Sequence, residues 1–417
     1  MGAFFKKHIN AIFILGTLLI ILVLGIHNNE LSNLWQALQT LSFKWILLCV
    51  VTYGVYVFLD SLTLYYFLRK QQYPVTLKYA LFISAIGFYY ADITPGASGG
   101  QPMQIYYLKK RNVPIGVSTS ALAVKFFCFQ FMLLILGAVA WGWHGAFVAV
   151  QLAGIRWILV AGYIFNAISV TLVLLMAVNK RVVRFILYAC IRIGYKLHFT
   201  KDIHHSTVKW EGILSSFHAS VDLIRNRPKE LLVQLLLSGF QVLAHMTILV
   251  CVYYAFGLSG TSIGVLITMA LLLYISAAYT PLPGGSGVQE GGFLLYFKAI
   301  IPDDRIFTGM LIWRFFTFYL NLIGGFGATV FQSSYELYKE KRRLKAVQKE
   351  YDKALVQEIA TNKKAKPKRK RKGIQNLPKR ISYKRKKPQG KTVRQHLGVI
   401  REPGGKCAAK GAGNNRV

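Results

Sequence analysis

The chain has 417 residues, of which 54% are hydrophobic, and carries a formal net charge of +35. A soluble domain must leave a polar surface for water, so this composition, with a mean hydropathy of +0.39, excludes an ordinary soluble globular domain. The charge is uneven, because 27 of the 51 Lys and Arg and 6 of the 16 Asp and Glu lie from Glu336 onward, which leaves +21 in that tail and +14 in the rest.

Six apolar segments have the length of about 20 residues that a transmembrane helix needs. They are residues 9–26, 45–68, 115–141, 157–178, 231–256 and 306–331. The first follows Lys6 and Lys7 and precedes no small-residue cleavage site, so we interpret it as an uncleaved anchor rather than a signal peptide. Two shorter apolar segments, residues 75–90 and 262–279, run directly into Pro and Gly and are expected to be half-helices.

Short basic loops are retained in the cytoplasm, and the loops of this chain alternate in charge. The basic stretches are residues 6–7, 69–70, 109–111 and 180–227, and the stretches with almost no positive charge are 27–43, 142–154 and 301–304. All basic loops fall on one side if both half-helical segments re-enter the membrane. We therefore expect an all-α integral membrane protein of the cell membrane. It would be a polytopic helical bundle of about six full crossings plus two re-entrant helical hairpins, with both termini cytoplasmic.

Two further segments are rich in Lys and Arg. Residues 181–199 mix them with apolar residues, which favours an amphipathic helix in the headgroup layer over a soluble linker helix. Residues 335–359 are expected to extend the last membrane helix into the cytoplasm, and residues 363–372 and 379–391 are charge blocks with too few apolar residues for a core. We divide the chain into a membrane domain, 1–335, and a basic, largely disordered cytoplasmic tail, 336–417. Contact of the tail with anionic headgroups is favoured over nucleic-acid binding.

Two Gly/Pro-rich breaks, residues 94–102 and 280–292, share a common pattern. Each opens with Thr-Pro, passes through glycines to a serine, has a glutamine three residues later, and is followed 24 or 25 residues after that by a cation. The matched residues are Thr94, Pro95, Ser98, Gln101 and Lys125 in the first copy, and Thr280, Pro281, Ser286, Gln289 and Arg314 in the second. The two cations lie on helices expected to run in opposite directions. The pattern therefore predicts an inverted repeat, with halves around 75–143 and 262–332.

Backbone freed by Pro and Gly cannot be satisfied by lipid, and charge at membrane depth costs a few kcal/mol or more, so both features predict a polar interior site. The candidate substrate or translocation residues are Asp92, Thr94, Pro95, Ser98, Gly99, Gln101, Lys125, Thr280, Pro281, Gly284, Ser286, Gln289, Glu290 and Arg314. Two buried cations beside half-helix N-termini would attract an anion, and phosphate is the anion expected in a membrane. Asp92 and Glu290 would serve as counter-charges or contact an amine of the substrate.

Simpler interpretations stay open for several of these residues. Lys125 and Arg314 could instead form structural ion pairs, and the matched Ser and Gln residues could serve only to cap the broken helices. Asp60 is a possible proton-coupling carboxylate, although a hydrogen bond between helices is the simpler interpretation. The five cysteines include no C-x-x-C pair, and we find no P-loop and no metal-ligand spacing, so neither a cofactor nor a metal is expected.

The paired Thr-Pro…Gly…Ser…Gln breaks resemble the membrane domain of the lysylphosphatidylglycerol synthase/flippase family, over about residues 5–335. The resemblance implies a flippase that moves aminoacylated phosphatidylglycerol to the outer leaflet, lowering surface negative charge and conferring resistance to cationic peptide antibiotics. Full-length members add a soluble synthase that transfers lysine from lysyl-tRNA to phosphatidylglycerol. After Phe331 this chain has only a short basic tail, so we expect no catalytic residues, and a separate synthase protein as a possible partner.

The leading hypothesis is an integral membrane flippase-like transporter for (aminoacyl-)phosphatidylglycerol or a related anionic lipid. The first alternative is the phosphatidylglycerol lysyltransferase that the family label names, although we expect no synthase domain for that chemistry. The second is a non-transporting membrane scaffold whose basic tail recruits a partner.

Overall fold

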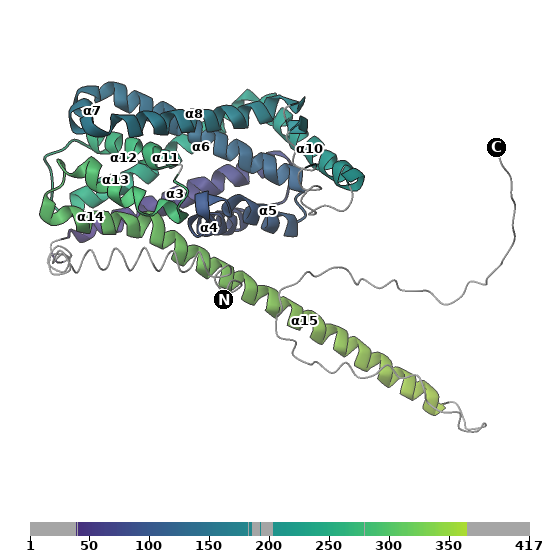
Figure 1. Cartoon of the computed structure of the whole chain (residues 1–417). Helices are drawn as coiled ribbons and strands as arrows, with labels where there is room; N and C mark the ends of the chain where they lie inside the picture. The colour runs from purple at the N-terminus through teal and green to yellow at the C-terminus, as the bar shows by residue number, and fades with distance from the viewer. Residues whose placement is uncertain are drawn as a thin grey trace, which may run out of the picture. The chain divides into compact units, whose positions relative to one another are not determined.

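The computed structural model describes residues 41–181, 183–185, 203–278 and 280–364 together with residues 39 and 192. Helices make up the regular structure of these residues, and no strand occurs among them. The chain divides into two compact units, residues 1–345, which we call the membrane body, and residues 346–417 (Figure 1). The expected crossing at 9–26, most of the expected helix at 181–199 and the charge blocks after Lys364 lie outside the described residues.

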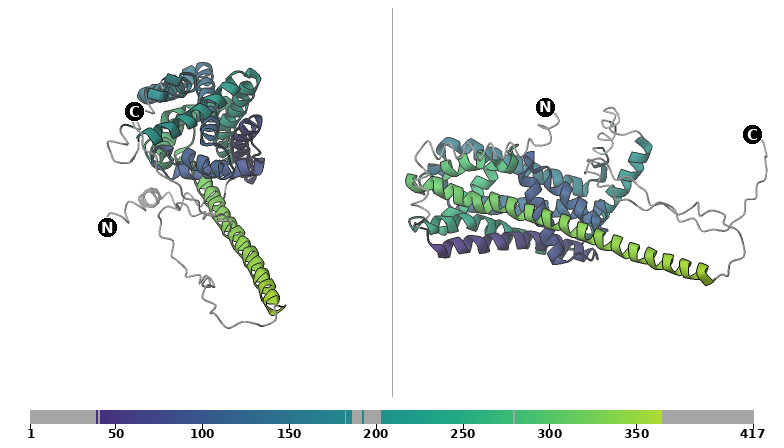
Figure 2. Two further views of the ribbon diagram at one scale, coloured as in Figure 1. Left: turned by 90° about the vertical axis from the view of Figure 1, so that its right-hand side faces the viewer. Right: turned by 90° about the horizontal axis from the view of Figure 1, so that it is seen from below.

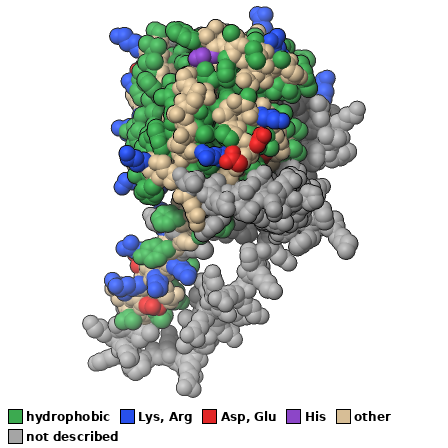
Figure 3. All heavy atoms as spheres, turned by 90° about the vertical axis from the view of Figure 1, so that its left-hand side faces the viewer, with side chains coloured by type: hydrophobic (Ala, Val, Ile, Leu, Met, Phe, Trp, Pro, Cys, Tyr) green, Lys and Arg blue, Asp and Glu red, His purple; other side chains and the backbone are tan. Residues whose placement is uncertain are grey.

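Five helices are long and apolar enough to cross a membrane. They are α3 (Phe43–Lys70), α6 (Ile115–Trp143), α8 (Arg156–Val178), α11 (Pro228–Ala255) and the helix formed by α14 (Asp303–Arg314), η4 (Phe315–Tyr319) and the start of α15 (Leu320–Lys364). Their positions agree with five of the six expected crossings in length and composition. Large apolar side chains such as Phe165 and Ile323 are exposed on them, and hydrophobic side chains cover much of the surface in Figure 3. The protein is a multi-pass helical membrane protein, because several helices of this length with exposed apolar side chains match a hydrocarbon core about 30 Å thick.

Two interrupted elements lie between these helices. Broken helix 1 consists of α4 (Leu77–Asp92), η1 (Pro95–Ala97) and α5 (Gly100–Lys110), and broken helix 2 consists of α12 (Ile263–Ala277), η3 (Pro283–Gly285) and α13 (Val288–Phe297). No half-helix has the roughly 20 residues that a crossing needs. The half-helices expected from sequence are thus present. Both short 3₁₀ turns begin at a proline, which has no N–H to donate into the preceding helix.

The order of elements is the same in two parts of the chain: a long helix, a half-helix, a 3₁₀ turn, a second half-helix and another long helix. The first copy runs from α3 to α6 and the second from α11 into α15, with the connecting elements α7 (Gly145–Gln151), η2 (Ala153–Ile155), α8 and α10 (Ile203–Arg225) between them. Figure 2 shows the helices from two further sides. The sequence motifs predict repeat halves that begin around residues 75 and 262. In the structure each copy begins one long helix earlier, with α3 and α11.

The opening helices of the two copies, α3 and α11, pack against each other in opposite directions. The rings of Trp45 and Tyr254 stack 4.9 Å apart near one end, and Gln234 Nε2 donates to the Thr63 carbonyl oxygen over 3.0 Å toward the other. Residue numbers therefore rise along α3 as they fall along α11. This antiparallel pairing agrees with the predicted inversion of the two copies.

Each broken helix packs in its own apolar core. The buried side chains of Leu266, Phe293 and Phe297 belong to a cluster around α11, α12 and α13. Ile83 and Leu108 belong to a second cluster between α3, α4, α5 and α6. The two broken helices thus pack in different clusters, although the cluster of broken helix 2 also includes Cys49 of α3 and Leu133 of α6.

Candidate functional site

The two breaks meet in space although more than 180 residues separate them in the chain. The Gly96 N–H donates to the Pro281 carbonyl oxygen over 3.1 Å, which joins η1 to the segment just before η3. In broken helix 1, the Thr94 hydroxyl donates to the Tyr90 carbonyl over 2.6 Å and accepts from the Gly99 N–H over 2.8 Å. A single backbone hydrogen bond therefore links two breaks that are each closed by local bonds.

The turn geometry shifts the expected correspondence between the breaks. Pro95 and Pro283 each begin a 3₁₀ turn, and the following glycines, Gly96 and Gly284, have left-handed φ values of 57° and 59°. Pro95 therefore corresponds to Pro283, and Pro281 instead supplies the acceptor for Gly96. The sequence could not decide which proline of the second break starts the turn, because both prolines stop the preceding half-helix.

Arg314, on α14, holds broken helix 2 through three partners. Its Nε lies 2.7 Å from Glu290 Oε1, its Nη1 donates to Gln289 Oε1 over 2.8 Å, and its Nη2 donates to the Gly284 carbonyl over 3.1 Å. The guanidinium also lies 4.6 Å from the centre of the Phe318 ring. Arg314 is only 2% exposed, so these contacts are shielded from solvent. A planar guanidinium with several donors suits this arrangement better than a lysine ammonium.

Glu290 connects Arg314 to the start of α13. Its second oxygen, Oε2, accepts from the Gly287 N–H over 2.6 Å. A carboxylate in the first turn of a helix is stabilised by the free N–H groups and by the positive end of the helix dipole. The sequence predicted that half-helix N-termini attract an anionic substrate. At the N-terminus of α13, the carboxylate of Glu290 occupies this position instead.

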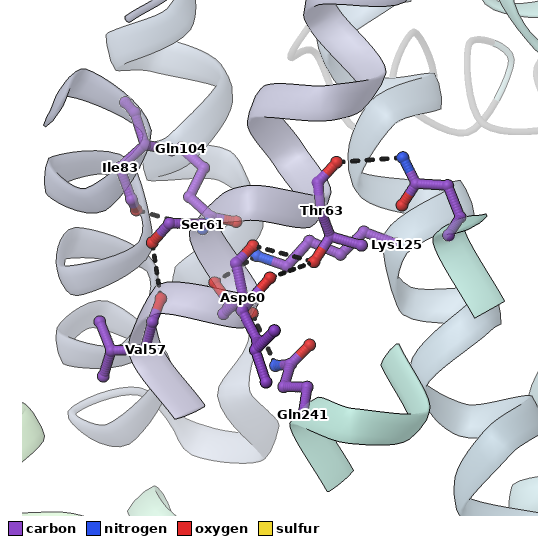
Figure 4. Close-up of polar contacts among 10 residues, drawn as sticks. Val57, Asp60, Ser61, Thr63, Ile83, Gln104, Lys125 and Gln241 are labelled. Carbon is purple, nitrogen blue, oxygen red and sulfur yellow. Dashed lines mark hydrogen bonds and ion pairs between the residues drawn. The ribbon is translucent and has the colours of Figure 1, made fainter. Parts of the chain in front are cut away.

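Lys125, on α6, has a different partner from the one expected. Its Nζ lies 2.5 Å from Oδ2 of Asp60 on α3, and Gln241 of α11 donates to Oδ1 of the same carboxylate over 3.0 Å. Figure 4 shows Lys125 and Gln241 converging on Asp60. Asp60, and not the acid of broken helix 1, therefore balances the first cation. Asp60 also makes the bond between helices that we considered its simpler role.

Asp92, at the end of α4, contacts the other copy of the repeat. Asn321 Nδ2, on α15, donates to Asp92 Oδ2 over 3.1 Å and to the Thr317 carbonyl over 3.0 Å. The Tyr53 hydroxyl of α3 donates to Asn321 Oδ1 over 2.9 Å. This fixes the amide so that its NH₂ group faces Asp92, and it joins three helices at the first break.

A π-helical segment, η4, separates Arg314 from Asn321. Their separation of seven residues makes about two α-helical turns, so in an uninterrupted α-helix both side chains would lie on nearly one face. The extra residue of a π turn rotates the rest of the helix by about 100°. The helix can therefore present Arg314 to broken helix 2 and Asn321 to broken helix 1.

The matched polar residues are not equivalent in the structure. Gln289 contacts Arg314, whereas Gln101 is exposed. Ser286 is 4% exposed, whereas Ser98 lies on an exposed turn. The repeat thus preserves the backbone breaks more closely than the side-chain contacts.

Sequence reasoning missed four polar residues in or beside this region. They are Tyr53, Gln241, His245 and Asn321. Gln241 and Asn321 complete the contacts of Asp60 and Asp92, and His245 lies buried with its ring centroid 4.6 Å from that of Tyr56. A polar residue within an otherwise apolar membrane helix was the available signal, but such residues also serve ordinary helix packing.

Alanine at Gly284 and at Gly96 is expected to have unequal effects. Both glycines adopt nearly the same left-handed conformation, which costs alanine about 1–2 kcal/mol. A Cβ atom at Gly284 would overlap the Phe318 ring, whereas no atom lies within 4 Å of the corresponding position at Gly96. Gly284→Ala should therefore lower the unfolding free energy by about 1–3 kcal/mol more than Gly96→Ala. Chemical or thermal unfolding in detergent measures the difference, and equal effects would contradict the packing of Phe318 on Gly284.

The fold and its interior define the class of the protein: a multi-pass helical membrane protein with a repeated unit, two broken helices and two interior ion pairs, one of them at broken helix 2. Residues 10–325 match the family model described as the lysylphosphatidylglycerol synthase TM region, so the chain belongs to this family. No curated protein matches the sequence significantly. Family membership agrees with the resemblance of the two breaks and makes this a lipid-related membrane domain.

Proposed function

We propose that this protein is a flippase-like transporter that moves a phospholipid between the leaflets of the cell membrane. The observation that carries the proposal is the hydrogen bond from Gly96 to Pro281, where two broken helices of oppositely directed repeats meet beside buried charges. Membrane transporters place their sites at such breaks, near the interface of inverted repeats. Membership in a lipid-related membrane family makes a lipid the favoured substrate.

The broken helices would be re-entrant and would enter from opposite faces of the membrane. Each half-helix is too short to cross, and backbone groups released at the prolines need protein or water around them. Separation of η1 from η3 breaks one backbone hydrogen bond between them, which costs little by itself. Larger movements of the two copies would also rearrange contacts between them, such as Gln241 to Asp60 and Asn321 to Asp92. Alternating access would follow from opening this contact toward one leaflet and then toward the other. From the charge of the loops we expect both termini to lie in the cytoplasm.

The headgroup would exchange with the protein's own carboxylates. Arg314 and Lys125 each already hold an acid, so a lipid phosphate must compete with Glu290 or Asp60. A carboxylate released in this way can accept an amine of the same headgroup. Aminoacylated phosphatidylglycerol carries both the phosphate and the amine, whereas phosphatidylglycerol itself carries only the phosphate. Outward movement of the aminoacylated lipid would lower surface negative charge and raise resistance to cationic peptides.

Lipid movement by paired charge variants tests the proposal. Lys125→Met leaves Asp60 buried without a cation, which is expected to cost about 3–5 kcal/mol of stability. The double variant Lys125→Met/Asp60→Asn removes both charges while its new amide still accepts from Gln241, so it should regain most of that stability. We expect the double variant to lose at least about tenfold in lipid movement, equivalent to about 1.4 kcal/mol in the barrier.

The measurement is the loss of labelled phosphatidylglycerol from the inner leaflet of liposomes that contain the purified protein. Protein-free liposomes give the lowest rate of lipid movement, and liposomes with the wild type give the reference rate. Wild-type rates in the double variant would reduce the Asp60–Lys125 pair to a structural role. A wild type that moves no phosphatidylglycerol or aminoacylated phosphatidylglycerol would overturn the proposed function.

A further inference from the structure

We infer that Asp92 is the carboxylate that takes up and releases a proton as the two broken helices separate and close, an inference that rests on the proposed function. The sequence analysis named Asp60 as the candidate for this role, and Asp92 and Glu290 are the other two carboxylates of the candidate site. The structure distinguishes them by their partners.

Among the described residues between the ends of the membrane helices, there is one carboxylate more than there are cations. Between the ends of the described membrane helices, Asp60 is paired with Lys125 at 2.5 Å and Glu290 with Arg314 at 2.7 Å. Asp92 receives a hydrogen bond from the neutral amide of Asn321 and has no ion-pair partner in the described part of the chain. A carboxylate without a cation at membrane depth costs a few kcal/mol, and it can become neutral by binding a proton.

The groups that face Asp92 do not supply the missing positive charge. From α3, the hydroxyls of Tyr53 and Tyr56 lie near enough to interact with it electrostatically, and both are neutral acids. Arg314 also lies within electrostatic range, but its guanidinium is committed to broken helix 2. On the α5 side, Gly100 packs closely on the same half of α4, and η3 carries no charged side chain.

The donor set favours a proton over a metal ion. Hard cations such as Ca²⁺ take six or more oxygen ligands. Here one carboxylate faces an amide whose oxygen is used by Tyr53 and whose NH₂ group is used by Asp92 and Thr317. The described residues hold no cluster of three His, Cys, Asp or Glu that could bind a metal. A protonated carboxyl keeps the bond from Asn321 through one oxygen and gains a hydroxyl donor on the other.

The position of Asp92 connects this proton to movement. It ends α4 two residues before Thr94, and the adjoining break contains the Gly96 contact to Pro281. Opening of that contact to one side admits water, and the carboxyl then gives its proton to that water as the charged carboxylate becomes solvated. Closing removes the water, so the carboxylate must first be neutralised, either by a proton from the open side or by the amine of an aminoacylated headgroup. If the step with lipid uses the amine and the return step uses a proton, one proton crosses the membrane in the opposite direction for each lipid.

Infrared difference spectroscopy on the purified protein tests the proton site without any transport. A change of pH should produce a band from the C=O stretch of a protonated carboxyl. We expect this band to disappear in Asp92→Asn, which keeps the shape and the acceptor for Asn321. The matched control, Asp60→Asn, removes a carboxyl that already has a cation and should keep the band. Persistence of the band in Asp92→Asn, or its loss only in Asp60→Asn, would overturn the inference.

The transport arm uses liposomes with an imposed pH gradient. For the wild type, the rate of lipid movement should depend on the direction of the gradient, and a pH-sensitive dye should report proton movement with the lipid. For Asp92→Asn, the ratio of the rates for the two gradient directions should fall to unity, and the dye signal should disappear. A gradient response that survives in Asp92→Asn would overturn the coupling. A wild type that moves no lipid would overturn the proposed function, and the infrared band would still decide the proton site.

Discussion

Arg314→Met is expected to stop lipid movement and to lower the free energy of unfolding by about 3–5 kcal/mol, because Glu290 would be left buried without its cation. The guanidinium also donates to Gln289 and to the Gly284 carbonyl. The substitution therefore removes the cation that pairs with Glu290 and two further hydrogen bonds. Unfolding in detergent gives the stability, and the liposome assay gives the activity.

Two further variants separate charge from geometry at this position. Arg314→Met/Glu290→Gln restores neutrality but still leaves the Gly284 carbonyl without its donor, so stability should return only in part. The Lys125/Asp60 double variant, by contrast, should recover more fully, because Lys125 has a single acidic partner. Arg314→Lys keeps the charge and loses the several donors of the guanidinium, and it should fall between the wild type and Arg314→Met. Full recovery in the charge-neutral Arg314 variant would contradict the importance of the added hydrogen bonds.

A cross-link between the two breaks is expected to stop lipid movement completely and reversibly. The Gly96 to Pro281 bond is 3.1 Å long, and one peptide plane lies on each side of it. The Cα atoms of Pro95 and Pro281 therefore lie within about 8 Å of each other. Cysteines in Pro95→Cys/Pro281→Cys should form a disulfide after small backbone movements. Mild oxidation should then arrest lipid movement, and a reductant should restore it.

Single-cysteine variants provide the control for the cross-link. Cys49, Cys128 and Cys251 are buried, and Cys190 and Cys407, which lie outside the described residues, are replaced by serine in all of these variants. Oxidation should then not affect the rate in Pro95→Cys or Pro281→Cys alone. The fraction of cross-linked protein, measured on a gel, should equal the fraction of activity lost. Lipid movement at the uncross-linked rate in fully cross-linked protein would show that separation of the breaks is not part of the cycle.

The membrane class, five apolar helices of crossing length, the two half-helical breaks and the residues of the Glu290–Arg314 pair could be predicted from the sequence. These follow from local properties: the length of an apolar run, the absence of a proline N–H, and charge inside an apolar segment. The continuation of the last membrane helix beyond residue 335 was likewise confirmed, since α15 ends at Lys364.

Which polar side chains pair in the interior is visible only in the tertiary structure. Asp60 lies 65 residues before Lys125, and nothing in the spacing predicts that α3 and α6 turn these two side chains toward each other. The contact between Asn321 and Asp92 was not predictable either, because it depends on an added π turn that no sequence pattern indicated. Rotation of a helix about its axis is set by packing against its neighbours, and in lipid, apolar periodicity is too weak to indicate it. Packing thus left Asp92 as the one acid of the described interior without a cation.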